Sequence, residues 1–224
     1  MRSVRLNFSK SGRAIYISHL DINRMMIRAL RRAKLPIWYT EGFNPHPYIS
    51  FALPLSLGQS SDCEYMDIRV EEDISNEEIV DRLNAVLPDG VKILSAAEPV
   101  RDPKEIAKAQ YFIKIIFATD EEAQGFCQKA NEQLDSEELL AEKRSKKGHR
   151  KIMKQINLKD YIYDAKISCA QNTVNLTAVL AAGSTENLNP ALLVSTLENC
   201  ASVSHQQLYI VRKKLITKNN EIFR

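Results

Sequence analysis

Three side chains within the first 46 residues could carry out acid–base chemistry near neutral pH. Tyr16, His19 and His46 are the candidates, because imidazole has a reference pKa of about 6.5 and a phenol can also transfer a proton. Ser18 is the expected N-cap of a helix, with Asp21 three residues on as in a capping box, so His19 stands at the start of that helix. His46 stands between two prolines on a stiff loop. If the three converged, they could cleave RNA without a metal. The alternative is that His19 serves the helix start and His46 shapes the loop.

Four arginines recur on one face of the helix that the sequence predicts over residues 19–34. They occupy positions i, i+4, i+7 and i+8: Arg24, Arg28, Arg31 and Arg32. Guanidinium groups match phosphate oxygens with paired hydrogen bonds. Lys10 and Arg13 add positive charge just before the helix, and Asp21 is the one acid among residues 1–38. The face is therefore either a phosphate-binding surface or an ordinary solvated helix surface.

A second basic run occupies residues 143–154, with seven Lys/Arg and no acid. Its candidate RNA-binding residues are Lys143, Arg144, Lys146, Lys147, Arg150 and Lys151. The run is either a basic hairpin that becomes ordered on a ligand or a solvated loop. Aromatic residues that could stack on bases also occur in the first 48 residues: Phe8, Tyr16, Trp38, Tyr39, Phe43 and Tyr48.

Charge is sorted along the chain although the formal net charge is only +3. Residues 1–38 carry nine Lys/Arg, whereas residues 62–89 carry ten acids against Arg69 and Arg82. A chain arranged in this way can present a positive face while it stays near neutral overall. Together with the two basic runs, this sorting predicts an RNA partner.

The cysteines and the hydropathy pattern point away from metal, cofactor and membrane classes. Cys63, Cys127, Cys169 and Cys200 are far apart in sequence and have no histidine at metal-ligand spacing, so we expect reduced thiols, no metal and no cofactor. No apolar run follows the basic N-terminal residues, and none approaches the roughly 20 residues of a membrane span. We therefore expect a cytoplasmic protein without membrane contact.

The hydrophobic periodicity predicts an α+β fold built from two tandem ferredoxin-like (β-α-β-β-α-β) domains with antiparallel sheets. The expected domains are 1–98 and 105–224, and the second carries a basic hairpin insertion near 143–156. Strands are expected at 4–8, 37–40, 49–53, 64–70, 91–94, 110–117, 139–144, 160–169, 174–180 and 203–214, and helices at 19–34, 76–87, 120–134 and from 190 onward. The apolar face expected for the first helix is Leu20, Met26, Ile27, Leu30 and Ala33.

A set of short motifs in the first 70 residues resembles the radical SAM-linked protein family. The motifs are Phe8-x-Lys10-x-Gly12, Tyr16-Ile17-Ser18-His19-Leu20-Asp21, Gly42-Phe43-Asn44-Pro45-His46-Pro47, Ser50-Phe51-Ala52-Leu53-Pro54-Leu55 and Glu64-Tyr65-Met66-Asp67. Lys146-Lys147-Gly148 matches more loosely. The resemblance implies a bacterial domain of unknown function, fused to or encoded beside a radical SAM enzyme and often near ribosomal and RNA-processing genes. It supplies no catalytic residues.

Three hypotheses follow for the function. The first is an RNA-binding accessory protein that works with a radical SAM enzyme in rRNA or tRNA modification or processing. The second is a metal-independent endoribonuclease using His19 and His46, by fold-level analogy with CRISPR repeat-processing enzymes. The third is a protein–protein adaptor for the radical SAM partner that makes no RNA contact. Because no catalytic constellation is complete, the sequence favours a non-enzymatic role. The scattered cysteines leave any iron–sulfur cluster to the partner.

Overall fold

The computed structural model describes residues 1–147, 150–183 and 185–224, and for 143–147 and 150–154 it describes the backbone path alone. Gly148 and His149 of the basic run therefore lie outside the described residues. Helices and strands both contribute, which confirms the predicted α+β class. No helix in the described part of the chain has the length and apolar character needed to cross a bilayer.

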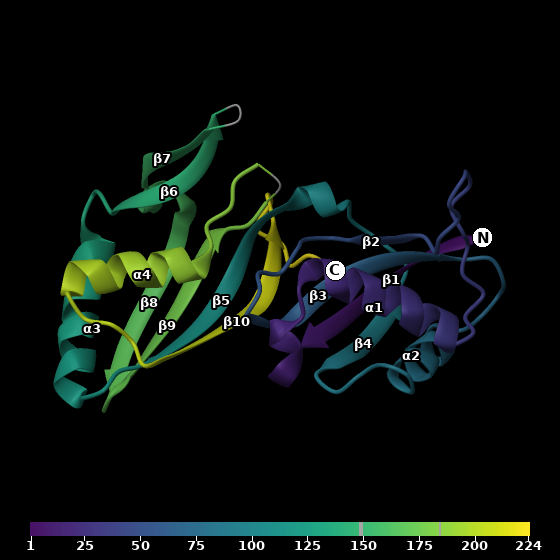
Figure 1. Cartoon of the computed structure of the whole chain (residues 1–224), viewed down its shortest axis with the longest axis horizontal. Helices are drawn as coiled ribbons and strands as arrows, with labels where there is room; N and C mark the ends of the chain where they lie inside the picture. Colours follow the sequence, from purple (N-terminus) through teal and green to yellow (C-terminus); the bar gives the residue numbers. More distant parts are fainter. Residues whose placement is uncertain (148–149, 184) are drawn as a thin grey trace. The chain divides into compact units, whose positions relative to one another are not determined.

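The described residues form four α-helices, ten strands and three short 3-10 helices (Figure 1). The helices are α1 (His19–Arg32), α2 (Asn76–Asn84), α3 (Asp120–Asp135), α4 (Pro190–Ala201), η1 (Gly12–Tyr16), η2 (Pro103–Glu105) and η3 (Leu158–Tyr161). The strands are β1 (Arg2–Lys10), β2 (Ile49–Phe51), β3 (Ser60–Val70), β4 (Val91–Ala97), β5 (Ile106–Ile116), β6 (Leu140–Lys147), β7 (Arg150–Asn157), β8 (Ile162–Ala170), β9 (Thr173–Ala181) and β10 (Gln207–Thr217).

Eight strands form one mixed sheet in the order β4-β1-β3-β10-β5-β9-β8, with β2 also paired to β3. β6 and β7 form a separate hairpin. β10 runs parallel to β3, with Val211 and Arg212 opposite Ser60 and Ser61. The prediction of antiparallel sheets alone was therefore wrong. Alternation identifies a strand but does not say which neighbour will satisfy its unpaired N–H and C=O groups.

The first compact unit comprises Met1–Ile106 together with Val211–Arg224. In it, α1 and α2 lie on one face of β1, β3 and β4 (Figure 1). The alternating residues Val4, Leu6 and Phe8 of β1 point into the core between sheet and helices. The buried stripe of α1 is Ile22, Met26, Ala29 and Leu30. Leu20, expected in this stripe, is 59% exposed, because the helix is rotated so that Ile22 takes the inward position.

The second compact unit is Ala107–Ile210. β5 pairs with β9, and β9 pairs with β8, both antiparallel. α3 and α4 lie next to each other against these strands (Figure 1). Tyr111, Phe117 and Phe126 are among its largest fully buried side chains. The β6–β7 hairpin follows α3, where the sequence predicted a basic hairpin insertion.

One buried arginine joins four segments of the first unit. Arg5 on β1 is 3% exposed, and its Nε and Nη2 donate to the two carboxylate oxygens of Asp67 at 2.7 Å each. Its Nη1 donates to the backbone carbonyls of Arg101 at 2.8 Å and Arg224 at 3.0 Å. The guanidinium also lies 4.6 Å from the ring centroid of Phe223. Arg5 therefore fixes the segments before and after the second unit onto β1 and β3.

Replacing Arg5 should destabilise the first unit markedly. Arg5→Gln leaves the Asp67 carboxylate, whose side chain is 17% exposed, without its bidentate partner. We expect the free energy of unfolding to fall by about 3 kcal/mol, as when one member of a buried ion pair is removed. Urea unfolding followed by circular dichroism measures this change. The control is Arg82→Gln, whose pair with Glu78 is exposed and should contribute no more than about 1 kcal/mol. If both variants lose the same free energy of unfolding, the buried Arg5–Asp67 pair does not stabilise the first unit more than an exposed pair does.

Candidate nucleic-acid interface

The start of α1 is fixed by a cap that the sequence predicted. The backbone N–H of Asp21 donates to Ser18 Oγ at 3.2 Å, and Ser18 Oγ donates to Asp21 Oδ2 at 2.7 Å. The carboxylate also lies in the first turn, where the helix dipole favours negative charge. The expected N-cap at Ser18 is confirmed, and it fixes where α1 begins.

The four arginines of α1 are all exposed, and we call Arg24, Arg28, Arg31 and Arg32 the arginine face. Arg24 lies 3.5 Å from Asp21, and both side chains are more than half exposed. The guanidinium of Arg31 lies 5.8 Å from the ring centroid of Tyr39. Among the side chains that the structure describes, no carboxylate forms an ion pair with Arg28 or Arg32. The arginine face is therefore only weakly neutralised by the protein itself.

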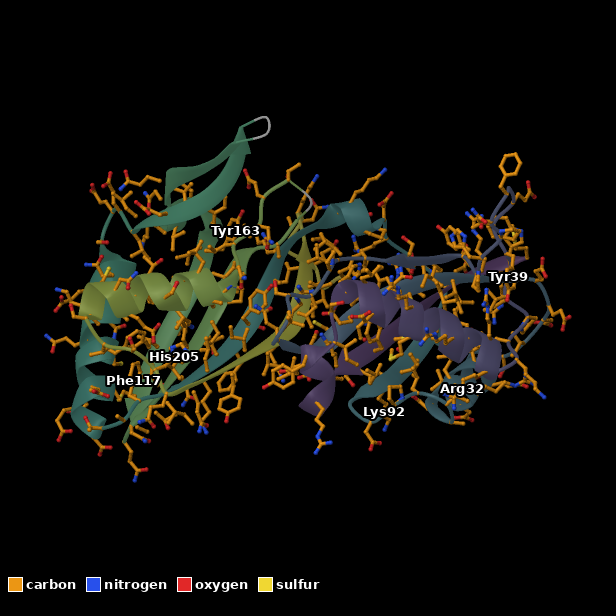
Figure 2. The ribbon with its side chains drawn as sticks, in the orientation of Figure 1. Arg32, Tyr39, Lys92, Phe117, Tyr163 and His205 are labelled. Atoms are coloured by element: carbon orange, nitrogen blue, oxygen red, sulfur yellow. The ribbon has the colours of Figure 1, made fainter. Side chains whose placement is uncertain are left out.

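A groove of about 540 Å³ runs beside this face in the first unit. On the α1 side it is lined by Asp21, Arg24, Arg28 and Arg32, with Met25 and Ala29 also on its surface. The other side is the segment that follows α2: Val86, Leu87 and Pro88. The structure thus brings three of the four predicted arginines onto one concave surface. Arg32 is labelled in Figure 2.

Lys10, which the sequence assigned to the RNA-binding surface, is buried instead. Lys10 is 3% exposed, and its Nζ donates to the carbonyls of Ile17 at 2.8 Å and Ile15 at 3.3 Å. Burial lowers the pKa of Lys10 below its ordinary value, and the nearby Glu64 carboxylate acts in the opposite direction. An ammonium held in this way cannot reach a phosphate. Arg13 on η1 is exposed, and its contact with RNA stays a prediction.

Residues from the family motifs meet around a small cavity behind α1. Lys10, His19, Phe51 and Glu64 all line it, together with apolar side chains. Its volume is about 10 Å³, room for about one water molecule and no substrate. Glu64 in turn pairs with Arg212, whose Nη1 donates to its carboxylate at 3.0 and 3.3 Å. The motif residues therefore build a buried charge cluster, and its chemical use in this conformation is to hold segments together.

The three acid–base candidates are placed separately. The ring of His19 packs edge-on against Phe51 at 5.1 Å. His46 Nδ1 lies 3.1 Å from Thr40 Oγ1 and 3.0 Å from the carbonyl oxygen of Asn44, so His46 braces its own loop. Tyr16 is 74% exposed. All three are described residues, and no hydrogen bond or ring contact joins any two of them. The arrangement provides no acid–base pair ready for RNA cleavage.

The aromatic candidates divide into buried and exposed rings. Phe8 is 2% exposed and belongs to the core, so it cannot stack on a base. Trp38 and Tyr48 are half-buried and share the Arg69 guanidinium, which lies 5.2 and 4.4 Å from their ring centroids. Three of the six rings are exposed: Tyr16, Tyr39 and Phe43. These three remain able to receive a base.

The second basic run lies on the β6–β7 hairpin. Lys143, Arg144, Lys146 and Lys147 belong to β6, and Arg150 and Lys151 belong to β7. Their side chains lie outside the described part of the structure. The backbone register pairs cationic residues with cationic residues at three positions: 143 with 154, 146 with 151, and 147 with 150.

The His, Cys, Asp and Glu side chains of the described residues are the candidates for metal and thiol sites. No group of three or more His, Cys, Asp or Glu residues there could hold a metal ion. All four cysteines are free, and Cys63 is buried. Burial, and secondarily the Glu64 carboxylate, raises the pKa of the Cys63 thiol to about 12. Cys63 is therefore a structural thiol and not a nucleophile.

Sequence reasoning missed the buried Glu64–Arg212 pair and the apolar side of the groove. A signal for the pair was present. In β1, Lys10 continues the inward series of Val4, Leu6 and Phe8, and in β3 Glu64 shares the inward face of Met66 and Ile68. A charged residue at an apolar register position has to be buried with a partner or to displace the strand. No pattern in the sequence placed residues 86–88 opposite α1.

Native labelling tests the assignment of Cys63. At pH 8, a thiol with a pKa of about 12 has a thiolate population on the order of a thousandfold below that of an ordinary thiol. Cys63 should therefore be the slowest of the four cysteines to react with iodoacetamide, as measured by peptide mass spectrometry. Unfolding in urea should make the four rates similar. Fast native labelling of Cys63 would contradict the burial described here.

Comparisons with known proteins place the chain in a family. The family model "Uncharacterized protein conserved in bacteria (DUF2344)" matches residues 3–190. No curated protein matches the chain. Among solved structures, it is similar to a crystal structure of a Cbf5-Nop10-Gar1 complex, with a TM-score of 0.46, 10% identity, and coverage of 95% of this chain but 48% of that chain. A second is an unknown protein from Galdieria sulphuraria, with a TM-score of 0.26, 12% identity, and coverage of 94% and 98%. The chain spans about half the length of the first of these structures. From the family match, which covers most of its length, the chain belongs to the DUF2344 family of bacterial proteins.

Proposed function

We propose that this protein is an RNA-binding accessory protein that works with a radical SAM enzyme in the modification or processing of rRNA or tRNA. The observation that carries the RNA assignment is the groove beside α1. Three exposed guanidinium groups line it, and the one carboxylate beside them, Asp21, is itself exposed and 3.5 Å from Arg24. An exposed pair at that distance neutralises little charge.

The spacing of the arginines suits a polyanion better than a single small anion. Arg24, Arg28 and Arg32 follow one another at four-residue intervals, which is about 6 Å per step along a helix. A row of this kind can contact successive phosphates of one strand, and each contact releases a counterion. A small anion would use one or two of the three positions.

The β6–β7 hairpin supports the same proposal independently. Its register sets lysine or arginine opposite lysine or arginine at three positions. Like charges that are directly opposite destabilise an antiparallel pair. A bound polyanion removes this repulsion, so the hairpin gains stability when it contacts a nucleic-acid backbone. The paired strands β6 and β7 would therefore bind RNA and be stabilised by it.

We also propose that each unit is a variant of the ferredoxin-like β-α-β-β-α-β arrangement. In the first unit the strands lie in the order β4-β1-β3-β2, and the second half of the sheet has the order β10-β5-β9-β8. Numbered within each half, with the hairpin left aside, both orders become 4-1-3-2, with helices in the two crossover connections. This repeat of topology supports a tandem origin for the two halves.

A protein partner is supported by an exposed apolar surface near the start of α1. Tyr16, Leu20 and Leu57 are 74%, 59% and 63% exposed, and Gly58 donates a backbone hydrogen bond to the carbonyl of Ile15 at 2.9 Å. Exposed apolar groups that are close together are typical of protein-binding sites. We propose the radical SAM enzyme as this partner, because the family motifs imply that association and the partner would supply the iron–sulfur cluster. A purely adaptor role would use this surface alone.

Charge reversal on α1 tests the RNA-binding proposal. The wild-type chain should bind rRNA or tRNA fragments at micromolar or lower Kd in about 100 mM salt, with affinity that falls as salt rises. The triple variant Arg24→Glu, Arg28→Glu and Arg32→Glu should bind at least about 100-fold more weakly, because it turns three favourable phosphate contacts into repulsive ones. Fluorescence anisotropy with labelled RNA measures both constants.

A control variant separates local contacts from net charge. Lys92→Glu, Lys104→Glu and Lys214→Glu reverse three exposed cations of the same unit and change the net charge equally. Lys92, labelled in Figure 2, alternates with the buried Val91 and Ile93 on β4 and so faces away from the helices. The control should retain RNA binding within a few-fold. If the two triple variants weaken binding equally, or if neither does, the groove is not the RNA site.

A further inference from the structure

The groove beside α1 has two chemically different sides. Its α1 side carries the guanidinium groups of Arg24, Arg28 and Arg32, and its other side is the apolar segment Val86, Leu87 and Pro88. Val86 and Leu87 are half-buried and pack in part on the core, while Pro88 is exposed. A ligand that fills the groove has to satisfy positive charge along one side and bury apolar surface along the other.

A duplex satisfies only one of these sides. An A-form helix presents phosphates and 2′-hydroxyl groups on its outside and keeps the faces of its bases stacked within. Placed over the groove, it would contact the arginines and leave the apolar side of Val86, Leu87 and Pro88 against polar backbone. Desolvating polar groups against apolar side chains gives no gain.

An unpaired strand satisfies both sides. Its phosphates can follow the arginine row, and its bases are free to turn away from the backbone and lay their flat, weakly polar faces on apolar side chains. Met25 and Ala29 lie between the arginines on the groove surface and extend the apolar contact. The groove volume of about 540 Å³ falls within the usual range for a pocket that takes a ligand of nucleotide size.

An exposed aromatic ring lies beside Arg31, the fourth member of the arginine face. Tyr39, labelled in Figure 2, is 41% exposed, and the Arg31 guanidinium lies 5.8 Å from its ring centroid. A base that stacks on such a ring also lies beside the Arg31 guanidinium, which can strengthen the stacking by a cation–π contact. Arg31, the member of the arginine face that does not line the groove, thereby acquires a ligand-binding role.

From these contacts we propose that the groove binds single-stranded RNA and discriminates against duplex RNA, with phosphates on Arg24, Arg28 and Arg32 and bases on the apolar side and on Tyr39. This inference rests on the proposed RNA-binding function and deepens it. It names an unpaired segment, such as a loop, a bulge or an end of a folded RNA, as the part that this chain holds.

The test compares one labelled RNA in two states. A strand of about 12 nucleotides that does not pair with itself is measured by fluorescence anisotropy, alone and annealed to its complement. We expect the single strand to bind at least tenfold more tightly than the duplex. Three phosphate contacts on a single strand predict a slope of log K against log salt of about −2, and Arg28→Ala should reduce its magnitude by about 0.7.

Two matched pairs of variants separate base contacts from charge. Tyr39→Ala should weaken single-strand binding at least about fivefold without changing the salt slope. Its control is Tyr163→Ala in the second unit, a ring that is 48% exposed and has Lys108 Nζ 4.1 Å from its centroid. Val86→Thr, which makes the apolar side more polar at nearly constant volume, should weaken binding about threefold or more. Its control is Val80→Thr, a half-buried valine on α2 that packs on the same core.

Each of three other outcomes would contradict a different part of this proposal. If single strand and duplex bind equally, and the triple reversal of Arg24, Arg28 and Arg32 abolishes both, the preference for single strands is wrong. RNA binding at α1 would still be supported. The proposed base contacts are wrong if Tyr39→Ala and Val86→Thr leave RNA affinity unchanged. They are also wrong if the controls Tyr163→Ala and Val80→Thr lower the affinity as much. If the wild-type chain binds neither RNA, the proposed function fails together with this inference.

Discussion

The ion pair between Glu64 and Arg212 is the interaction on which the first unit depends. Both residues are buried, so each charge requires the other, and Arg212 Nη2 also donates to the carbonyl of Pro54 at 2.9 Å. The same carboxylate lowers the cost of burying Lys10. Lys10 in turn binds the carbonyls of residues 15 and 17, immediately before α1. One carboxylate thus joins β3, β10, the loop after β2 and the start of α1.

This arrangement separates two kinds of positive charge. Inside the unit, Lys10 and Arg212 share Glu64, and Arg5 has Asp67 and two carbonyls. On the surface of α1, the protein supplies little compensation. A buried cation without a partner would prevent folding, whereas an exposed cation costs almost nothing until a ligand arrives. The pairing inside therefore reflects stability, and the weak pairing on α1 supports the proposal that this helix binds an anion.

The sequence was informative wherever a local rule determined the outcome. The α+β class, the Ser18 cap and the hairpin after α3 follow from periodicity and capping chemistry, and the structure contains them. The sequence was less informative about features that tertiary packing determines, such as strand pairing and helix rotation. Nothing local shows that β10 pairs in parallel with β3, or that Ile22 takes the inward place given to Leu20. The groove needed both α1 and residues 86–88, which are close only in the folded chain.

Lys10 shows why a charge count alone misassigns residues. It was grouped with the arginines of α1 because it precedes them in a basic segment, yet its position in β1 continues the inward face of Leu6 and Phe8. The register of a strand fixes the side on which every residue lies, and a one-residue change would move the whole set. When strand register and local charge composition give different locations for a residue, the register is the better guide to whether its side chain is buried. By the same reasoning, the helical positions of Arg24, Arg28 and Arg32 assign them to the surface more securely than their charge does.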